Sequence, residues 1–81
     1  MKVYVPLSVL NPGYRAIIHS IHDGPSYRRM LDMGLVPKTP LEVIRKAPFG
    51  DPIAILVRGF YLALRKAEAS RIIVEVIDQV T

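Results

Sequence analysis

A short amphipathic helix that runs into a glycine is the feature that most constrains how this chain can fold. Its apolar residues and the glycine fall at i, i+3, i+4 and i+7: Tyr27, Met30, Leu31 and Gly34. This spacing gives one apolar helical face that ends at a residue tolerant of left-handed dihedrals. If Gly34 is the first residue beyond the helix, Leu35 stands where a Schellman cap makes its apolar contact, about one turn from Met30. The sequence therefore predicts a rigid helix end at Gly34.

Most of the remaining chain has the pattern of short strands. β-Branched and aromatic residues occur in runs bounded by glycine or proline, which is typical of strands and turns. Arg58-Gly59 separates two such runs, a spacing that fits a two-residue hairpin whose glycine has a positive φ. We predict strands over 14–21, 41–46, 53–57, 60–64 and 72–77, with single helical turns over 7–10 and 65–70.

These elements predict a mainly β fold. About five strands, one short helix after the first strand and one helical turn before the last indicate a small, partly open barrel. A two-layer sandwich would need a longer chain than these 81 residues. The length also predicts a single domain over residues 1–81, with a core too small to enclose a large cofactor.

Composition excludes several classes of protein. Hydrophobic residues make up 51% of the chain and charged residues 22%, which favours a packed domain over a disordered chain. Because there is no cysteine, disulfides, thiolate zinc sites and cysteine nucleophiles are excluded. The apolar run over 53–57 ends at Arg58, far short of the ~20 residues that span a bilayer. The N-terminal residues lack the regions of a signal peptide, so we expect a cytoplasmic protein without a membrane span.

The chain is basic, with 11 Lys and Arg against seven Asp and Glu and a formal charge of +4. This excess raises the prior for a nucleic-acid or acidic-protein partner. The basic pairs are spread along the chain and acidic residues separate them, so we expect mostly solvated faces. Phe60 and Tyr61 alternate sides of one predicted strand and form no stacking platform, which disfavours nucleic acid as the partner.

Histidines are the main candidates for acid-base or metal chemistry. On the strand over 14–21 we expect Ile17, His19 and Ile21 on one side. His19 and His22 would then point to opposite faces, unless the strand ends or bends near Ser20, and the sequence shows no third ligand. We expect structural or surface histidines and no cofactor, with weak binding of a divalent metal as the alternative. The glycines are isolated and form no phosphate-binding loop, so the residues predict a binding protein and not an enzyme.

Two motifs together resemble the FeoA family, ferrous iron transport protein A. They are the Met-Gly-Leu helix end within 29–37 and the Pro-Phe-Gly-Asp-Pro-Ile loop over 48–53. One predicted strand separates them, which makes the pair far more specific than either alone. Further similar segments lie at 7–13, 16–18 and 64–69. Lys38 departs from the family, which usually has glycine after the proline of this turn. Since a type II turn favours glycine there, we expect a type I turn or a slightly strained one.

The resemblance implies an SH3-like barrel and a function in iron uptake. It implies a cytoplasmic accessory of FeoB, a membrane transporter of ferrous iron that carries a cytosolic GTPase domain and would hold this chain near the inner membrane. The same barrel resembles the C-terminal domain of iron- and manganese-dependent repressors, so a metal-responsive module is an alternative. An unpaired barrel edge leaves a homo-oligomer open.

Connections that carry apolar side chains are the predicted contact with a partner. A contiguous exposed apolar patch usually marks a binding site. The alternative is that Leu35 and Phe49 plug the open ends of the barrel. The neighbouring arginines of the helix are either docking contacts or solvated. The predicted partner-binding residues are Arg28, Arg29, Met33, Leu35, Val36, Phe49 and Asp51.

Overall fold

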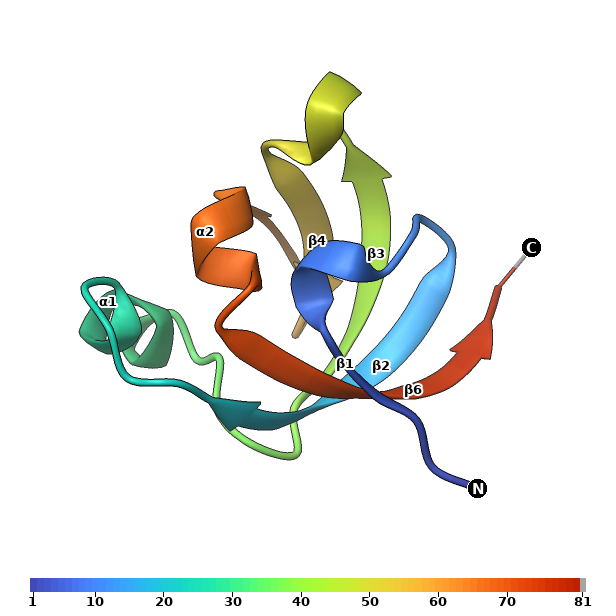
Figure 1. The fold of residues 1–81 in the computed structure, drawn as a ribbon, viewed down its shortest axis with the longest axis horizontal. Helices are drawn as coiled ribbons and strands as arrows, with labels where there is room; N and C mark the ends of the chain where they lie inside the picture. The colour runs from blue at the N-terminus through green and yellow to red at the C-terminus, as the bar shows by residue number, and fades with distance from the viewer. Residues whose placement is uncertain (81) are drawn as a thin grey trace.

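The chain folds into one curved antiparallel sheet of six strands, with two short α-helices at its end (Figure 1). The structure is a computed structural model, and it describes residues 1–80. In chain order the elements are β1 (Tyr4–Pro6), the 3-10 turn η1 (Leu7–Val9), β2 (Tyr14–Ile21), α1 (Tyr27–Asp32), β3 (Pro40–Lys46), the 3-10 turn η2 (Pro48–Gly50), β4 (Ile53–Val57), β5 (Phe60–Leu64), α2 (Lys66–Ala69) and β6 (Ile72–Gln79).

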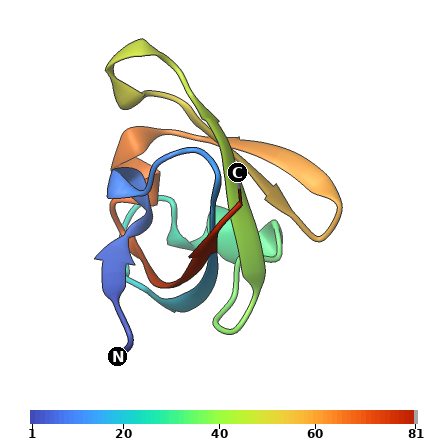
Figure 2. The ribbon, with the colours of Figure 1, turned by 90° about the vertical axis from the view of Figure 1, so that its right-hand side faces the viewer.

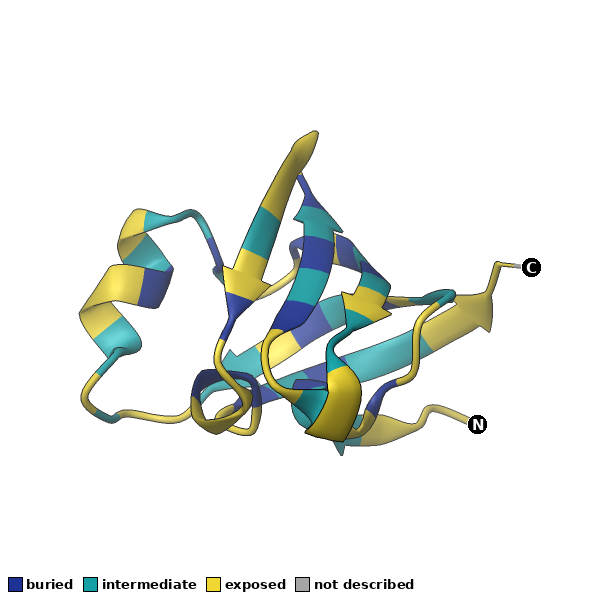
Figure 3. Ribbon diagram, turned by 90° about the horizontal axis from the view of Figure 1, so that it is seen from above, coloured by how far each residue is buried: buried dark blue, intermediate teal, exposed yellow. Residues whose placement is uncertain are grey.

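The strand order is β1-β6-β2-β3-β4-β5. Strands β2 to β5 follow one another as a meander, and β6 returns to lie between β1 and β2. The β3–β4–β5 part stands across the other strands, which gives the sheet its curl (Figure 2). The mainly β fold is confirmed, and all five predicted strands form. The sixth, β1, was not predicted; it pairs Tyr4 with Glu75. The N-terminal segment of the chain and the end of β6 lie on the side away from α1 (Figures 1 and 3).

The core lies inside this curl. Along β4, Ile53, Ile55 and Val57 are buried, whereas the residues between them are only half-buried. The same alternation of buried and half-buried positions is visible along the strands in Figure 3. Leu7 from η1 and Ala69 from α2 join the strands' buried side chains. The apolar positions of the sequence therefore face one common interior.

The helix end forms as the sequence predicts. Gly34 has a φ of +88° and its N–H donates to the Leu31 carbonyl at 2.9 Å. The N–H of Leu35 donates to the Met30 carbonyl at 3.0 Å. These two bonds define a Schellman motif, and the side chains of Met30 and Leu35 are both fully buried.

Left-handed backbone occurs at three non-glycine residues, Lys38, Phe49 and Arg58. In the β4–β5 hairpin both Arg58 and Gly59 have positive φ, 53° and 81°, which is a type I′ turn. In the turn after α1, Lys38 has a φ of 73° and the Thr39 N–H donates to the Val36 carbonyl at 3.2 Å. This is the strained type II geometry, and not the type I alternative. Strand β2 holds it, since the Lys38 N–H donates to the Ile18 carbonyl at 2.7 Å.

A bulge changes the faces of β2. Its register with β6 shifts between Ile18 and Ser20, at His19. Ile21 packs against the core although His19 is exposed. The prediction that Ile17, His19 and Ile21 share one side is therefore wrong, because an extra residue reverses the alternation.

Candidate partner-binding surface

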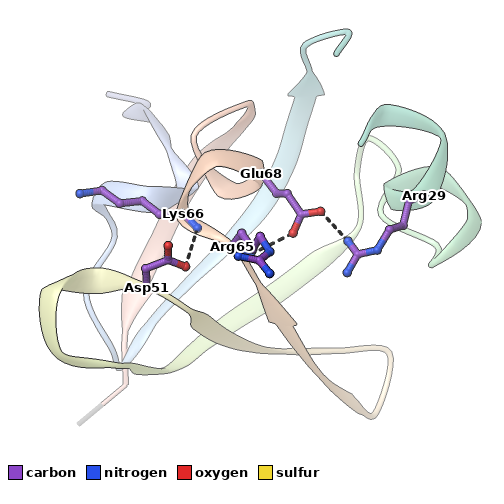
Figure 4. Close-up of polar contacts among 5 residues, drawn as sticks. All are labelled: Arg29, Asp51, Arg65, Lys66 and Glu68. Carbon is purple, nitrogen blue, oxygen red and sulfur yellow. Dashed lines mark hydrogen bonds and ion pairs between the residues drawn. The ribbon is translucent and has the colours of Figure 1, made fainter. Parts of the chain in front are cut away.

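An ion pair joins the two helices. Arg29 of α1 places Nη1 at 2.5 Å from Oε2 of Glu68 on α2. The other carboxylate oxygen, Oε1, accepts a hydrogen bond of 2.9 Å from the backbone N–H of Arg65. Glu68 is 8% exposed, which makes it the most buried charged residue of the described chain. Figure 4 shows the two carboxylate oxygens of Glu68 joined to Arg65 and to Arg29. Arg29, predicted as a docking residue, thus already has a structural partner.

The Glu68 carboxylate is held in its charged form. Burial by itself would raise the pKa of this group. The hydrogen bond from the Arg65 N–H, the nearby Ser26 side chain, and the positive charge and hydrogen bond of Arg29 together outweigh burial and lower the pKa below its usual value. A carboxylate that stays ionised between several donors stabilises the junction of helices and is not poised to take up a proton.

Asp51 ties the β3–β4 loop to the same helix. Its Oδ1 accepts a hydrogen bond of 3.1 Å from the backbone N–H of Lys66, the first residue of α2 (Figure 4). A carboxylate at this place satisfies an amide that the helix leaves unpaired. Asp51 remains exposed. Three of the segments quoted for the family resemblance, around Arg29, Asp51 and Glu68, are therefore joined by polar contacts through α2.

A groove lies between the end of α1 and the β4–β5 hairpin. Its volume is about 270 Å³. Half-buried Met33, a predicted contact residue, forms part of one wall, and exposed Phe60 forms part of the other. We call it the α1–hairpin groove. It is lined by Asp32, Met33, Gly34, Val57, Arg58, Phe60 and Leu62.

Leu35 does not belong to the surface. Its side chain has no exposed area, so the prediction that it contacts a partner is wrong. The Schellman bond to Met30 turns the residue after the glycine inward, where the apolar contact of the motif is buried. Val36, the next residue, is half-buried.

Arg28 is exposed and lies 3.7 Å from Asp32. An exposed pair of this kind contributes little to stability.

Phe49 is 98% exposed, at a φ of 70°. The alternative that it plugs the barrel is wrong, because the β3–β4 loop projects from the sheet instead of folding over its end (Figure 1). Helix α2 lies between this loop and α1 (Figure 4). The predicted residues therefore do not form one contiguous apolar surface. Met33 lies at the α1–hairpin groove and Phe49 on the projecting loop, whereas Arg29 and Asp51 line a common groove beside α2.

The histidines have ordinary surroundings. The ring of His19 lies against Tyr4, with centroids 4.7 Å apart and planes tilted by 53°. His22 follows β2, and its backbone N–H donates to the Arg71 carbonyl at 2.8 Å. Within residues 1–80, no three His, Cys, Asp or Glu side chains are grouped so that they could hold a metal ion.

Sequence reasoning missed the exposed aromatics of the hairpin. Phe60 is 69% exposed and Tyr61 is 71% exposed. They begin β5, the last strand in the sheet order. The signal was present, since two adjacent aromatics on a strand point to opposite faces and one must leave the core.

No helix in the described part of the chain is long and apolar enough to cross a bilayer.

Comparison with known proteins identifies relatives of this arrangement. The family model of the FeoA domain matches residues 5–76. A relative from Porphyromonas gingivalis, the Fe(2+) transport protein A/Fe(2+) transporter FeoB fusion protein, is 33% identical over 73 residues. That match covers 89% of this chain but 9% of the relative, so this chain corresponds to a small part of the fused polypeptide.

Solved structures support the same fold. An FeoA-like protein from Clostridium acetobutylicum gives a TM-score of 0.88 at 35% identity, covering 100% of this chain and 95% of that one. The Stenotrophomonas maltophilia FeoA complexed with zinc, described as an SH3 domain protein, gives 0.72 at 30% identity, covering 84% and 86%. A manganese-dependent transcriptional repressor gives 0.84 at 19% identity, covering 91% and 37%, which shows a shared fold alone. The predicted SH3-like fold is confirmed.

Proposed function

Since this chain belongs to the FeoA domain family, we propose that it is an accessory protein of ferrous iron uptake. In this proposal it binds an FeoB-type membrane transporter in the cytoplasm and modulates transport through protein contacts, without chemistry of its own. The transporter would supply the GTPase domain and would bring this chain to the membrane.

The observation that carries the proposal is the fused relative. In Porphyromonas gingivalis a homologous segment and an FeoB transporter are parts of one polypeptide. Covalent linkage raises the effective concentration of one part beside the other, which is useful where the two parts act together. A separate chain must reach the same proximity by binding.

The surface of this chain supports binding as its mode of action. Phe49 stands almost fully in solvent on the β3–β4 loop, and the α1–hairpin groove is walled by Met33 and Phe60. Exposed aromatic and methionine side chains are enriched where proteins associate. Asp51 fixes the loop that carries Phe49 to α2, which lowers the entropy lost when that loop meets a partner.

The test is retention of the chain on a detergent-solubilised FeoB-type transporter from the same genome. We expect the wild type to bind, and Phe49→Ala and Met33→Asp each to weaken binding at least tenfold. The matched control is Val9→Ala, which truncates an exposed apolar side chain on η1. A wild type that is not retained would overturn the proposal. Folded variants that bind as well as the wild type would remove these residues from the surface.

A consequence for transport can be measured in cells. Deleting this chain should lower the initial rate of ferrous iron uptake, and expression of the wild type should restore it. Phe49→Ala should restore it less well than Val9→Ala does, because only the former removes a proposed contact. Equal rescue by both variants would contradict a role of Phe49 in modulation.

A further inference from the structure

We propose that the free edge of β5 takes up an extended acidic segment of the partner as an additional strand of the sheet. This inference rests on the proposed function for the identity of the partner, but the docking edge itself stands on the geometry of this chain. Four features of β5 support the inference: open hydrogen-bonding groups, an unprotected edge, grooves along the strand and the charges at its two ends.

The hydrogen-bonding groups follow from the hairpin register. The type I′ turn pairs Val57 with Phe60, and the ladder continues without a break to the pair of Ile53 and Leu64. In such a hairpin the pair that closes the turn exchanges both hydrogen bonds, and every second pair does so after it. The N–H and C=O groups of Tyr61 and Ala63 therefore point away from β4. Neither residue makes a backbone hydrogen bond outside the strand ladders of the described chain.

The edge has none of the usual protection against pairing. Natural edge strands carry charges, prolines or bulges that prevent another strand from adding. The five residues of β5, Phe-Tyr-Leu-Ala-Leu, have no charge and no proline, and their register with β4 has no bulge. The opposite edge, β1, has only three residues and ends at Pro6. Of the two edges, β5 is thus the one built to accept a strand.

Grooves accompany both halves of β5. The α1–hairpin groove follows its first half at Phe60 and Leu62. A second groove of about 400 Å³ follows its second half. The side chains of an added strand would meet a largely apolar groove that also holds Asp32 and Arg58 at one end. At the other end they would meet arginines beside two carboxylates, Glu68 and Asp51, which already accept hydrogen bonds within the chain. The second groove is lined by Arg29, Asp51, Pro52, Ala63, Leu64, Arg65 and Glu68.

The charges select an acidic occupant. Arg58 precedes β5 and Arg65 follows it, and neither takes part in an ion pair among residues 1–80. A second copy of this chain, paired antiparallel about Leu62, would set Arg58 of each copy opposite Lys66 of the other. Like charges directly opposite destabilise strand pairing, and each copy carries a net charge of +4. An extended segment with carboxylates toward both ends would instead neutralise the two arginines.

The test uses a synthetic peptide, Asp-Thr-Val-Thr-Val-Thr-Asp, titrated into the full isotope-labelled chain. We expect the amides of Tyr61 and Ala63 to shift in the NMR spectrum and to become protected from hydrogen exchange. The same peptide with lysine at both ends should bind at least tenfold more weakly. Absence of binding by the acidic peptide, or binding that leaves these two amides unprotected, would overturn the proposal.

Variants separate the edge from other causes. Ala63→Pro removes the outward N–H at a place where an edge strand tolerates proline, and it should weaken binding at least tenfold. Ala63→Val keeps that N–H and should bind within twofold of the wild type. Arg58→Asn removes a charge while suiting the type I′ turn, so a severalfold loss of binding could not be ascribed to misfolding. Equal binding by Ala63→Pro would overturn the proposal.

Three further outcomes are informative. If sedimentation shows a dimer of the wild type that Ala63→Pro dissociates, the occupant is a second copy and the acidic segment is wrong. If the transporter retains the wild type and Ala63→Pro equally, the edge is not its docking site, whereas the proposed function stands. If the transporter retains neither but the peptide binds β5, the proposed function fails and the docking edge stands.

Discussion

The guanidinium of Arg29 lies 2.5 Å from the carboxylate of Glu68, and this contact joins α1 to α2 across 39 positions of the chain. The same carboxylate accepts the Arg65 N–H and so caps the helix that carries it. One side chain therefore fixes both the start of α2 and the distance between the two helices. Its protonation state matters for the stability of the whole fold.

Stability should depend on pH through Glu68. Its pKa is lowered in the folded chain, so its stabilising contribution is fully present above the unfolded pKa of about 4.3. That contribution is lost as the pH falls through the lower folded pKa. Glu68→Gln should reduce the free energy of unfolding at pH 7 by about 1–2 kcal/mol. The variant should also lose less of its free energy of unfolding than the wild type when the pH falls from 7 to 3. Urea denaturation at pH 7 and pH 3 measures both.

The control for Glu68→Gln is Asp32→Asn, which removes one carboxylate from an exposed pair. It should change the free energy of unfolding by less than about 0.5 kcal/mol. If the free energy of unfolding fell as steeply with decreasing pH in Glu68→Gln as in the wild type, the result would contradict the role of Glu68.

The strain at Lys38 should be relieved by glycine. Lys38 is exposed and has a φ of 73°, a conformation that costs an L-residue about 1 kcal/mol or more. Lys38→Gly should therefore raise the free energy of unfolding by about 0.5 kcal/mol, after the greater entropy of glycine in the unfolded chain is subtracted. Thermal denaturation followed by circular dichroism measures it.

Gly34→Ala is the opposite experiment. A Cβ at Gly34 would meet only Arg58 side-chain atoms at 3.7 Å or more, so space is available, but its φ of +88° is unfavourable. Alanine should lower the free energy of unfolding by about 1–2 kcal/mol.

If Lys38→Gly destabilised the chain, the turn would have to draw stability from the lysine side chain instead.

Leu35 and Phe49 should separate stability from binding. Leu35 is fully buried and Phe49 is 98% exposed. Leu35→Ala should cost about 2–4 kcal/mol through lost burial and the cavity that remains. Phe49→Ala should change stability by less than about 0.5 kcal/mol and act on partner binding alone. Chemical denaturation of both variants under one condition measures the two losses in free energy of unfolding. A large destabilisation by Phe49→Ala would contradict this prediction, because it would mean that the side chain packs against the fold.

Divalent metals should find no defined binding site on this chain. His19 contacts Tyr4, and no group of three ligand side chains occurs in the described part of the chain, whereas zinc sites need three or four ligands. Titration with zinc or with ferrous ions under anaerobic conditions should give no heat beyond that of the buffer. A defined binding isotherm that His19→Ala abolishes would contradict this expectation and support the metal-responsive alternative.

Local signals were the part of the fold that could be predicted from sequence. The helix end at Gly34 and the turn at Arg58-Gly59 depend on dihedral preferences of single residues, and both formed as expected. Strand β1 was missed because three residues are too few to show a period, and its partner Glu75 lies at the other end of the chain. The ion pair of Arg29 and Glu68 depends on how the sheet curls, which no local pattern specifies.

The candidate site was predicted only in part, for a related reason. Leu35 and Phe49 both stand in connections, and sequence gives no means to tell which one the fold buries. The hydrogen bond from the Leu35 N–H turned that residue inward, whereas a left-handed backbone at Phe49 holds the other on a projecting loop. The bulge at His19 similarly moved Ile21 to the core face.

The N-terminal segment and the end of β6 lie on the side of the molecule away from α1. A fluorescent label or an immobilising linker attached at the N-terminal segment or at the end of β6 would therefore lie away from α1. Attachment at these places would leave that helix free for the proposed contact with a transporter.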